Sequence, residues 1–398
     1  MITAIRNSYN KSFSDERYKQ ILADIEKDFP GLLEFRLAET PVFIDKNTKH
    51  QLLKAGEEIC NFITGPLFRS KTEKAFQHVA TPPKESALPE CIVMDFAICK
   101  NDDNEITPQL IELQGFPSLF GFEVIHDIAF KNNFEIPKGY APYLNGYDKS
   151  SYLQFLNSII KGVPNKQTVL LELFPHEQKT KIDFYYTSQL INLPVVCLSE
   201  LFMEDNALCY QRDGVTHTIE RIYNRIVWDE LSQQAPPMQA KAKLLLEHTG
   251  VEWVSHPNHF YRISKYIIPL LNSSYVPSAQ YLSNIQVLPL DLENYVLKPL
   301  FSYAGQGVII DVTPEDIHKI TDPENWILQK KVMYAPIIET PTGPAKTEIR
   351  LFYFYDHATH KYIATLNLAR LSKGKMIGVS YNANATWVGG SIAYFEQD

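Results

Sequence analysis

A lysine followed by a loop with two glycines, set between two apolar strands, is the feature that most constrains the fold of this chain. The segment runs from Tyr295 to Ile310 and contains Lys298, Gly305 and Gly307. Glycine lets the backbone approach a phosphate closely, and successive N–H groups in such a loop can bind an anion. Lys298 would place a positive charge on the same phosphates.

The element after this loop separates it from other phosphate-binding loops. Residues 308–312 read as a second strand, whereas the P-loop and the Rossmann fingerprint both open a helix. The sequence therefore predicts a β-hairpin that folds as a lid over a nucleoside triphosphate. An ordinary hairpin with a glycine turn would give the same pattern, and it stays open as the alternative.

This arrangement resembles the ATP-grasp ligases, in which a lysine stands at a strand end before a proline and a glycine-rich hairpin closes on ATP. The resemblance implies that Lys298, Ser302, Gly305 and Gly307 contact the nucleotide. We therefore expect ATP as a cofactor of this chain.

Two further segments match the same family. The apolar strand expected at 326–333 carries Gln329 and Lys330, and it corresponds to the family's hinge strand beside the adenine. Upstream, a helix-like segment at 263–271 carries Lys265, which corresponds to the family's first phosphate-binding lysine. A solvated surface charge is the alternative for Lys265.

A nucleoside triphosphate also calls for Mg²⁺, which prefers carboxylate and amide oxygens. Asp95 lies at the centre of an expected strand at 91–99, and Glu112 and Gln114 lie on one face of a second strand at 108–114. Asp95 would face them across the hairpin. A surface hairpin with charged residues is the alternative.

Acidic candidates that precede the glycine loop are typical of the circularly permuted ATP-grasp group, and the chain is similar to the glutathionylspermidine synthase-like family within it. The resemblance implies Asp95, Glu112 and Gln114 as Mg²⁺ ligands. Two departures stand out. Gln114 replaces the usual asparagine, and Val93 replaces an arginine two residues before the aspartate.

Arginines on three other expected strands are substrate or catalytic candidates. Arg225 lies in an apolar segment at 218–228, where it could clamp a substrate carboxylate or form a salt bridge with Asp229 or Glu230. Arg350 lies on an expected strand at 346–355, and the resemblance implies that it contacts the γ-phosphate or the acyl-phosphate. Arg370 lies near the end of an expected strand at 362–371, and either arginine could stabilise the charge on the transferred phosphoryl group or on the tetrahedral adduct. The polar loop 382–391 is either a second lid or a plain surface loop.

The order of expected elements predicts an α+β fold, which the resemblance makes a circularly permuted ATP-grasp fold with a small α/β pre-ATP-grasp domain and N-terminal helices at 14–29 and 47–65. The expected regions are a helical region at 1–90, the metal-ligand hairpin at 91–147, the pre-ATP-grasp-like domain at 148–250 and the nucleotide-binding domain at 251–398.

Composition limits the class of protein. The net charge of −8 leaves no basic surface for nucleic acid, and the longest apolar runs are too short to span a bilayer. The five cysteines form no C-x-x-C pair, so neither a disulfide framework nor a zinc site is expected. The N-terminus turns polar at once, which predicts no signal peptide. We expect a cytoplasmic enzyme without a membrane partner.

Together these features predict an ATP- and Mg²⁺-dependent carboxylate–amine ligase that works through an acyl-phosphate on a small amino acid or peptide-like substrate. A small-molecule kinase with the same ATP site and a nucleotide-binding scaffold without catalysis are the alternatives. The replacements at Val93 and Gln114 keep the scaffold alternative open.

Overall fold

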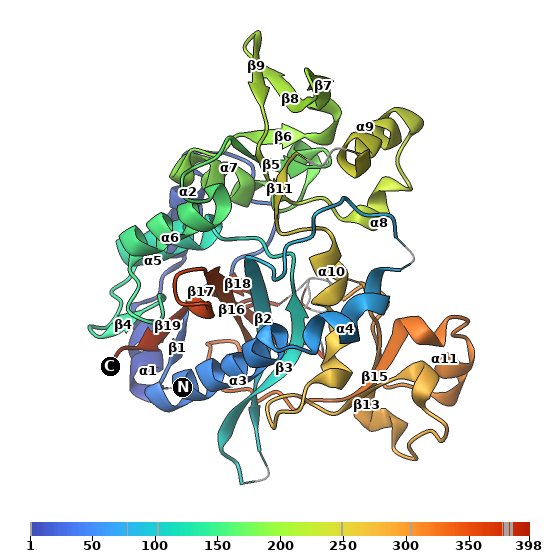
Figure 1. Ribbon diagram of the computed structural model, residues 1–398. Helices are drawn as coiled ribbons and strands as arrows, with labels where there is room; N and C mark the ends of the chain where they lie inside the picture. Colours follow the sequence, from blue (N-terminus) through green and yellow to red (C-terminus); the bar gives the residue numbers. More distant parts are fainter. Residues whose placement is uncertain are drawn as a thin grey trace.

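The computed structural model describes residues 2–77, 79–101, 103–247, 250–302, 305–375, 377, 382 and 385–398, and it shows a mixed α+β fold (Figure 1). Residues 303–304 of the glycine loop and 383–384 of the polar loop lie outside these ranges. None of the helices in the described ranges combines the length and the apolar character that a membrane crossing requires.

A five-stranded antiparallel sheet forms the centre of the molecule. Its strands, in spatial order, are β18 (Gly389–Ser391), β17 (Lys361–Ser372), β16 (Lys346–Asp356), β2 (Cys91–Lys100) and β3 (Ile106–Gln114). The strands expected at 91–99 and 108–114 therefore share one sheet with the strands expected at 346–355 and 362–371, because β2 pairs with β16. More than 200 residues separate the two pairs of strands in the sequence. This confirms that segments from both ends of the chain meet here.

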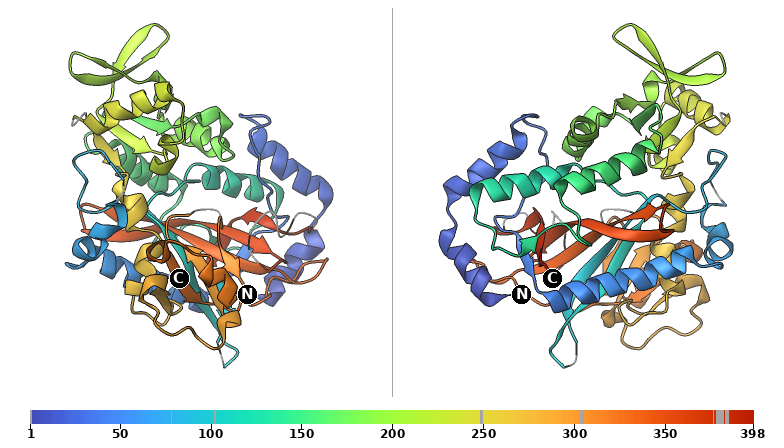
Figure 2. Two further views of the ribbon diagram at one scale, coloured as in Figure 1. Left: turned by 90° about the vertical axis from the view of Figure 1, so that its right-hand side faces the viewer. Right: turned by 60° about the vertical axis from the view of Figure 1, so that its left-hand side comes forward.

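One face of this sheet is apolar and packs on the long helix α3 (Lys46–Thr64). Met94, Ile349 and Leu351 point to this face and are fully buried. Figure 2 shows α3, in blue, along one side of the sheet, and α5 (Phe122–Asn133) and α6 (Lys149–Lys161), in green, along the other. Because side chains alternate along a strand, the residues between these apolar ones point to the opposite face.

Two of the four N-terminal helices, α2 (Asp15–Glu26) and α3, begin and end close to the helices predicted at 14–29 and 47–65. The other two, α1 (Thr3–Ser12) and α4 (Phe68–Thr72), were not predicted. The side chain of Asp45 caps α3 by accepting a hydrogen bond from the Thr48 N–H at 2.9 Å. Residues 1–90 also contribute a strand, β1 (Val42–Ile44), to a small sheet with β19 (Ala393–Glu396) and β4 (Tyr140–Ala141).

A four-stranded parallel sheet forms the α/β unit expected after residue 148. Its spatial order is β11 (Glu252–Val254), β10 (Arg221–Asn224), β5 (Thr168–Glu172) and β6 (Val195–Cys197), with α7 (Lys181–Ile191) between β5 and β6. The chain moves from β5 to β6 in one direction and later to β10 on the other side of β5. The order therefore reverses between β5 and β10, and such a point in a parallel sheet opens a crevice at the carboxyl ends of the strands.

A separate three-stranded sheet projects from this unit at the top of Figure 1. It consists of β7 (Phe202–Glu204), β8 (Ala207–Arg212) and β9 (Val215–Thr218), and it is inserted between β6 and β10. The sequence reading did not predict this insertion. The expected long strand at 218–228 is correspondingly short, since β10 ends at Asn224 and α8 (Trp228–Leu231) follows.

The predicted glycine hairpin lies in a small antiparallel sheet at the lower right of Figure 1. The order is β12 (Ala279–Tyr281), β15 (Trp326–Lys330), β13 (Tyr295–Pro299) and β14 (Ile309–Ile310). β13 and β14 pair in antiparallel fashion through two residue pairs, which confirms the hairpin but shortens its second strand. Gly305 and Gly307 both have positive φ, near 74° and 73°, which favours glycine at these turn positions.

The remaining helices are short except for one. They are α9 (Pro236–Glu247), α10 (Asn258–Arg262) and α11 (Pro314–His318). The helix expected at 263–271 is not an α-helix: α10 ends at Arg262, and a 3₁₀ helix that contains Pro269 covers Lys265–Leu270. Proline lacks an N–H and cannot continue an α-helix at this point. All five cysteines are buried and free of disulfides.

Candidate nucleotide-binding and catalytic site

The polar face of the central sheet collects most of the candidate residues. Asp95 on β2 lies directly opposite Arg350 on β16 and opposite Glu112 on β3. Residues that lie directly opposite each other in an antiparallel pair project from the same face. The register thus confirms that Asp95 and Glu112 face the same side, and Gln114 follows two residues after Glu112 on that face.

Two arginines hold the carboxylate of Asp95. The Nε and Nη2 atoms of Arg350 donate to the two oxygens of Asp95 at 2.6 and 2.7 Å, and Nη2 of Arg370 donates to Oδ2. Burial alone would raise the pKa of Asp95, but the positive charges of Arg350 and Arg370 lower it to about 2. Asp95 is therefore ionised at neutral pH.

Glu348 also belongs to the site, although it was not predicted from the sequence. It lies opposite Arg370 in the β16–β17 pair, accepts a hydrogen bond from the hydroxyl of Tyr334, and forms an ion pair with Arg370 at 3.2 Å. Burial raises the pKa of this carboxyl, against the lowering effect of Arg370. Its position two residues before Arg350 on the same strand was the available signal, because period-two spacing places both on one face.

Lys265 belongs to this cluster and is buried, so the alternative of a solvated surface charge is excluded. Its Nζ lies 3.2 Å from Oε1 of Glu112 and donates to the carbonyl of Ser302 at 2.5 Å. Lys265 therefore links β3 to the start of the glycine loop. The Ser302 hydroxyl is also near, 3.4 Å from the same ammonium.

Lys298 reaches the cluster from the small sheet. Its Nζ donates to the carbonyl of Ile111 at 3.1 Å, next to Glu112. Burial and the charge of Lys265 lower the pKa of Lys298 to about 8, while Glu112 and Glu348 act in the opposite direction. A phosphate bound nearby would favour the charged form of this buried ammonium and would raise its pKa again.

The other nucleotide candidates lie on the neighbouring strand β15. Gln329 is 2% exposed, and neither its amide nitrogen nor its amide oxygen has a hydrogen-bond partner among the described residues. Lys330 is exposed, and its backbone N–H donates to Ser278 at 2.9 Å. An unpaired buried amide is costly, so a polar ligand fits beside Gln329.

Only part of the predicted Mg²⁺ ligand set has oxygen atoms that suit a metal in this structure. Glu112 and Gln114 offer two oxygen donors on one face of β3, and such oxygens suit Mg²⁺. Both oxygens of Asp95, in contrast, already accept hydrogen bonds from guanidinium groups. Across the described ranges, no three histidine, cysteine or acidic side chains gather in a way that could hold a metal. The three-ligand set remains a prediction.

Arg225 lies outside the cluster but close to its border. It follows the last residue of β10, and its Nη1 donates to the carbonyls of Phe116 and Pro117 at 3.2 and 2.8 Å. The guanidinium also lies over the ring of Phe116, 4.4 Å from the centroid. Arg225 thus braces the loop that begins directly after Gln114.

Glu172 is a second candidate residue that was not predicted from the sequence. It ends β5, the strand beside β10, where the strand order reverses. Burial raises the pKa of Glu172 to about 8, although Arg225 acts to lower it. A carboxyl and a guanidinium therefore stand at the crevice end of the parallel sheet, next to the loop that follows Gln114.

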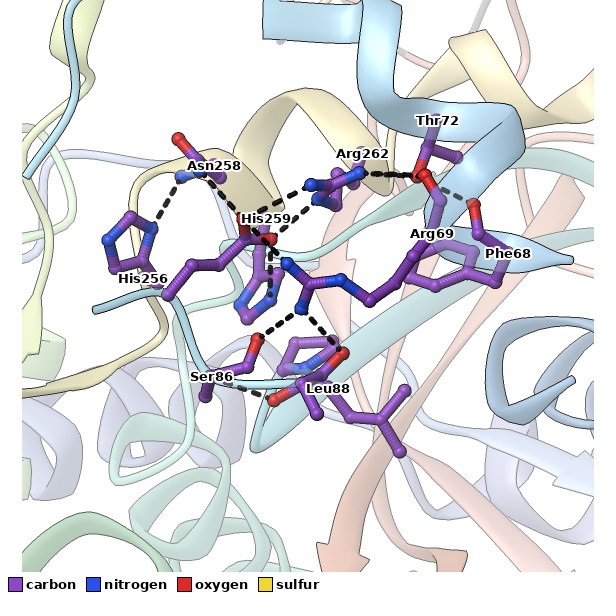
Figure 3. Close-up of polar contacts among 12 residues, drawn as sticks. Phe68, Arg69, Thr72, Ser86, Leu88, His256, Asn258, His259 and Arg262 are labelled. Carbon is purple, nitrogen blue, oxygen red and sulfur yellow. Dashed lines mark hydrogen bonds and ion pairs between the residues drawn. The ribbon is translucent and has the colours of Figure 1, made fainter. Parts of the chain in front are cut away.

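A buried polar network joins the end of α10 to α4 and to the segment at 85–88 (Figure 3). Arg262, at the end of α10, donates to Glu85 at 2.5 and 3.1 Å and to the hydroxyl of Thr72 at 2.8 Å. Asn258 donates to the same Glu85 at 2.8 Å. His259 is fully buried, and burial lowers its pKa to about 3. The network is a structural brace, because the guanidinium of Arg262 already neutralises Glu85.

The structure thus brings together Asp95, Glu112, Lys265, Lys298, Arg350 and Arg370, and it adds Glu348. It places Ser302 at their edge, Gln329 and Lys330 on the adjoining strand β15, and Arg225 at the neighbouring loop. Gly305 and Gly307 turn the hairpin that leaves β13. The polar loop 382–391 begins with Asn382, whose side chain hydrogen-bonds Ser372 at the end of β17.

Among solved structures, a glutathione synthetase-like effector from Globodera pallida has a similar fold, with a TM-score of 0.57. The alignment covers 98% of this chain and 99% of that chain, at 10% sequence identity. At this identity the likeness shows the fold alone. No protein-family model matches the chain, and no curated protein sequence matches it.

Proposed function

We propose that this chain is a Mg-ATP-dependent carboxylate–amine ligase with an ATP-grasp-like fold in circularly permuted order. The observation that carries the proposal is the cluster of four cations, Lys265, Lys298, Arg350 and Arg370, on one face of the central sheet, beside a glycine hairpin. The description of the structural neighbour as glutathione synthetase-like supports a ligase.

The charges of the cluster suit a polyphosphate. Three carboxyl groups, Asp95, Glu112 and Glu348, stand among the four cations, so the cations are held in place without an external anion. The arrangement keeps an excess of positive charge for the incoming nucleotide. Lys265 and Lys298 approach from the glycine hairpin side and would contact the phosphates.

The chemistry needs positioning and charge stabilisation more than a protein nucleophile. A substrate carboxylate oxygen attacks the γ-phosphorus, and ADP leaves. Arg350 and Arg370 would stabilise the charge on the transferred group. An amine then attacks the acyl carbon, loses a proton, and inorganic phosphate leaves.

Metal in this reaction enters with ATP as part of the substrate. It would supply charge neutralisation between the phosphates, and Glu112 and Gln114 are the residues whose oxygens fit it. Arg225 stands at the crevice of the parallel sheet, where the carboxylate end of an amino acid-like substrate would find a partner of opposite charge. An ammonium group of the substrate beside Glu172 would lower the raised pKa of that carboxyl and so favour its charged form.

A turnover experiment tests this proposal. The protein is incubated with Mg-ATP and pooled amino acids, short peptides and polyamines, and mass spectrometry follows the products. A condensed product with ADP supports the ligase, a phosphorylated product supports a kinase, and bound but unchanged ATP supports a scaffold.

Matched variants sharpen the result. Glu112→Gln should abolish ADP release while leaving the fold intact. Glu105→Gln changes an exposed acid at the tip of the same hairpin and should leave ADP release unchanged. Native turnover in Glu112→Gln would remove Glu112 from the site.

A further inference from the structure

The carboxylate of Asp95 is fully engaged by protein groups. It is 1% exposed, Oδ1 accepts from Arg350, and Oδ2 accepts from both Arg350 and Arg370. A metal ion that bound this carboxylate would have to displace a guanidinium group, and it would then remain next to the positive charge of that group. Like charges at such separations repel strongly in a buried site.

The strand register builds this arrangement into the sheet. Asp95 and Arg350 are directly paired residues of β2 and β16, and Arg370 reaches over from β17, one strand further away. Glu348 lies 3.2 Å from the same Nη2 atom of Arg370 that contacts Asp95, and the hydroxyl of Tyr334 donates to Glu348. Arg370 therefore lies between two carboxylates, each fixed by a strand.

The guanidinium group of Arg370 keeps donor capacity for a ligand. Arg370 remains 30% exposed at its side chain, and its buried Nε has no hydrogen-bond partner among the residues that the structure describes. Two guanidinium groups that share one carboxylate stand side by side, and paired N–H donors of this kind suit an oxyanion with two or three oxygens.

We propose that Asp95 is a positioning residue, which holds Arg350 and Arg370 together as a receptor for one oxyanion and does not ligate metal. This inference rests on the proposed function for the identity of that oxyanion, which is the phosphoryl group in transfer or the substrate carboxylate. Metal contact is then left to Glu112 and Gln114.

The first experiment measures thermal unfolding in EDTA, without nucleotide. Asp95→Asn should lower the melting temperature by several degrees, because it leaves two buried guanidinium groups without their shared carboxylate. The double variant Asp95→Asn/Arg350→Gln should recover part of this loss, since Arg370 keeps Glu348 as a partner. A carboxylate kept only for a cation would repel Glu112 in EDTA, so an unchanged or higher melting temperature in Asp95→Asn would overturn the proposal.

The second experiment measures Mn²⁺ affinity by electron paramagnetic resonance in the presence of saturating ADP, which carries no γ-phosphate that the two arginines would bind. The double variant should bind Mn²⁺ as the native protein does, whereas Glu112→Gln should bind it at least about tenfold more weakly, as expected on loss of a residue that holds the metal. An equal loss of Mn²⁺ affinity in the double variant would overturn the proposal.

A third measurement identifies the oxyanion. Calorimetric titrations with inorganic phosphate and with acetate, in the presence of ADP, distinguish a phosphoryl receptor from a carboxylate receptor. The preferred anion should bind the native protein and not the double variant, and equal binding to both would overturn the receptor role. If the native protein binds no nucleotide, the proposed function fails, while the melting temperatures in EDTA still decide the role of Asp95.

Discussion

Gly115 lies directly against the carbonyl oxygen of His259, so that a Cβ atom on Gly115 would come within 2.4 Å of that oxygen. The Gly115 N–H also donates to the carbonyl of Ile263 at 3.0 Å. This contact joins the end of β3 to α10, and so joins Glu112 to the segment that carries Lys265. A backbone atom cannot move aside as a flexible side chain can.

Gly115→Ala should therefore destabilise the protein by about 1–3 kcal/mol, as overpacking in a close contact does. Urea unfolding measures this change. Gly390→Ala is the matched control, because its Cβ would meet Leu37 at 3.4 Å and the carbonyl oxygen of Arg36 at 3.7 Å, both ordinary contacts. Equal free energies of unfolding for Gly115→Ala and the native protein would show that α10 does not pack closely against the end of β3.

Lys298 should give nucleotide binding a pH dependence. Its pKa of about 8 means that the ammonium loses its proton as pH rises through 8, and the phosphate contact weakens with it. Calorimetry should show affinity falling between pH 7 and 9 in the native protein. Lys298→Arg, which stays charged, should remove this fall, and Lys298→Ala should weaken binding by about 2–5 kcal/mol at pH 7. Equal affinities of native protein and Lys298→Ala would remove Lys298 from the site.

Glu172 should make the ligand-free protein less stable as pH rises. Its folded-state pKa of about 8 lies above the value for an unfolded chain, so the folded state holds the extra proton between these two values. Stability is therefore full at low pH and is lost as pH rises toward 8. Glu172→Gln should reduce this slope and be more stable than the native protein at pH 8 by at least about 1 kcal/mol. Urea unfolding at pH 5 and pH 8 measures both effects, and parallel pH profiles would contradict the assignment.

Arg262 should be essential to the buried polar network around Glu85 at the end of α10. Arg262→Ala leaves Glu85 without its buried partner and should cost about 3–5 kcal/mol of unfolding free energy. Arg69→Ala removes a second, more exposed partner of the same Glu85, at 3.3 Å, and should cost at most about 1 kcal/mol. Chemical denaturation of both variants gives the comparison. Similar losses would mean that burial does not distinguish the two contacts.

Local patterns in the sequence predicted the strands of the site and their faces. Period two along 108–114 placed Glu112 and Gln114 on one side, and the observed register with Asp95 confirms this. The same reasoning found the hairpin at Lys298, because a strand, a glycine loop and a strand are encoded within about twenty residues. The mixed α+β class followed from the alternation of such elements.

What the sequence did not reveal depends on which strands become neighbours. Arg370 meets Asp95 only because β17 and β2 lie on either side of β16, and no local pattern encodes that order. Glu348 was overlooked for the same reason, since its partner Arg370 is on another strand. Lys265 lies among Glu112 and Ser302, which are distant in sequence, so its burial could not be inferred from the local pattern around it.

The buried cysteines make native thiol reactivity a measure of conformational opening. Burial raises the pKa of the Cys60, Cys91 and Cys99 thiols, and the thiolate is the form that reacts. A thiol reagent should therefore label the chain only when a segment of the core opens. Cys91 and Cys99 stand at the two ends of β2, on either side of Asp95, so their labelling rates would report separately on how each end of the central strand opens, with and without nucleotide.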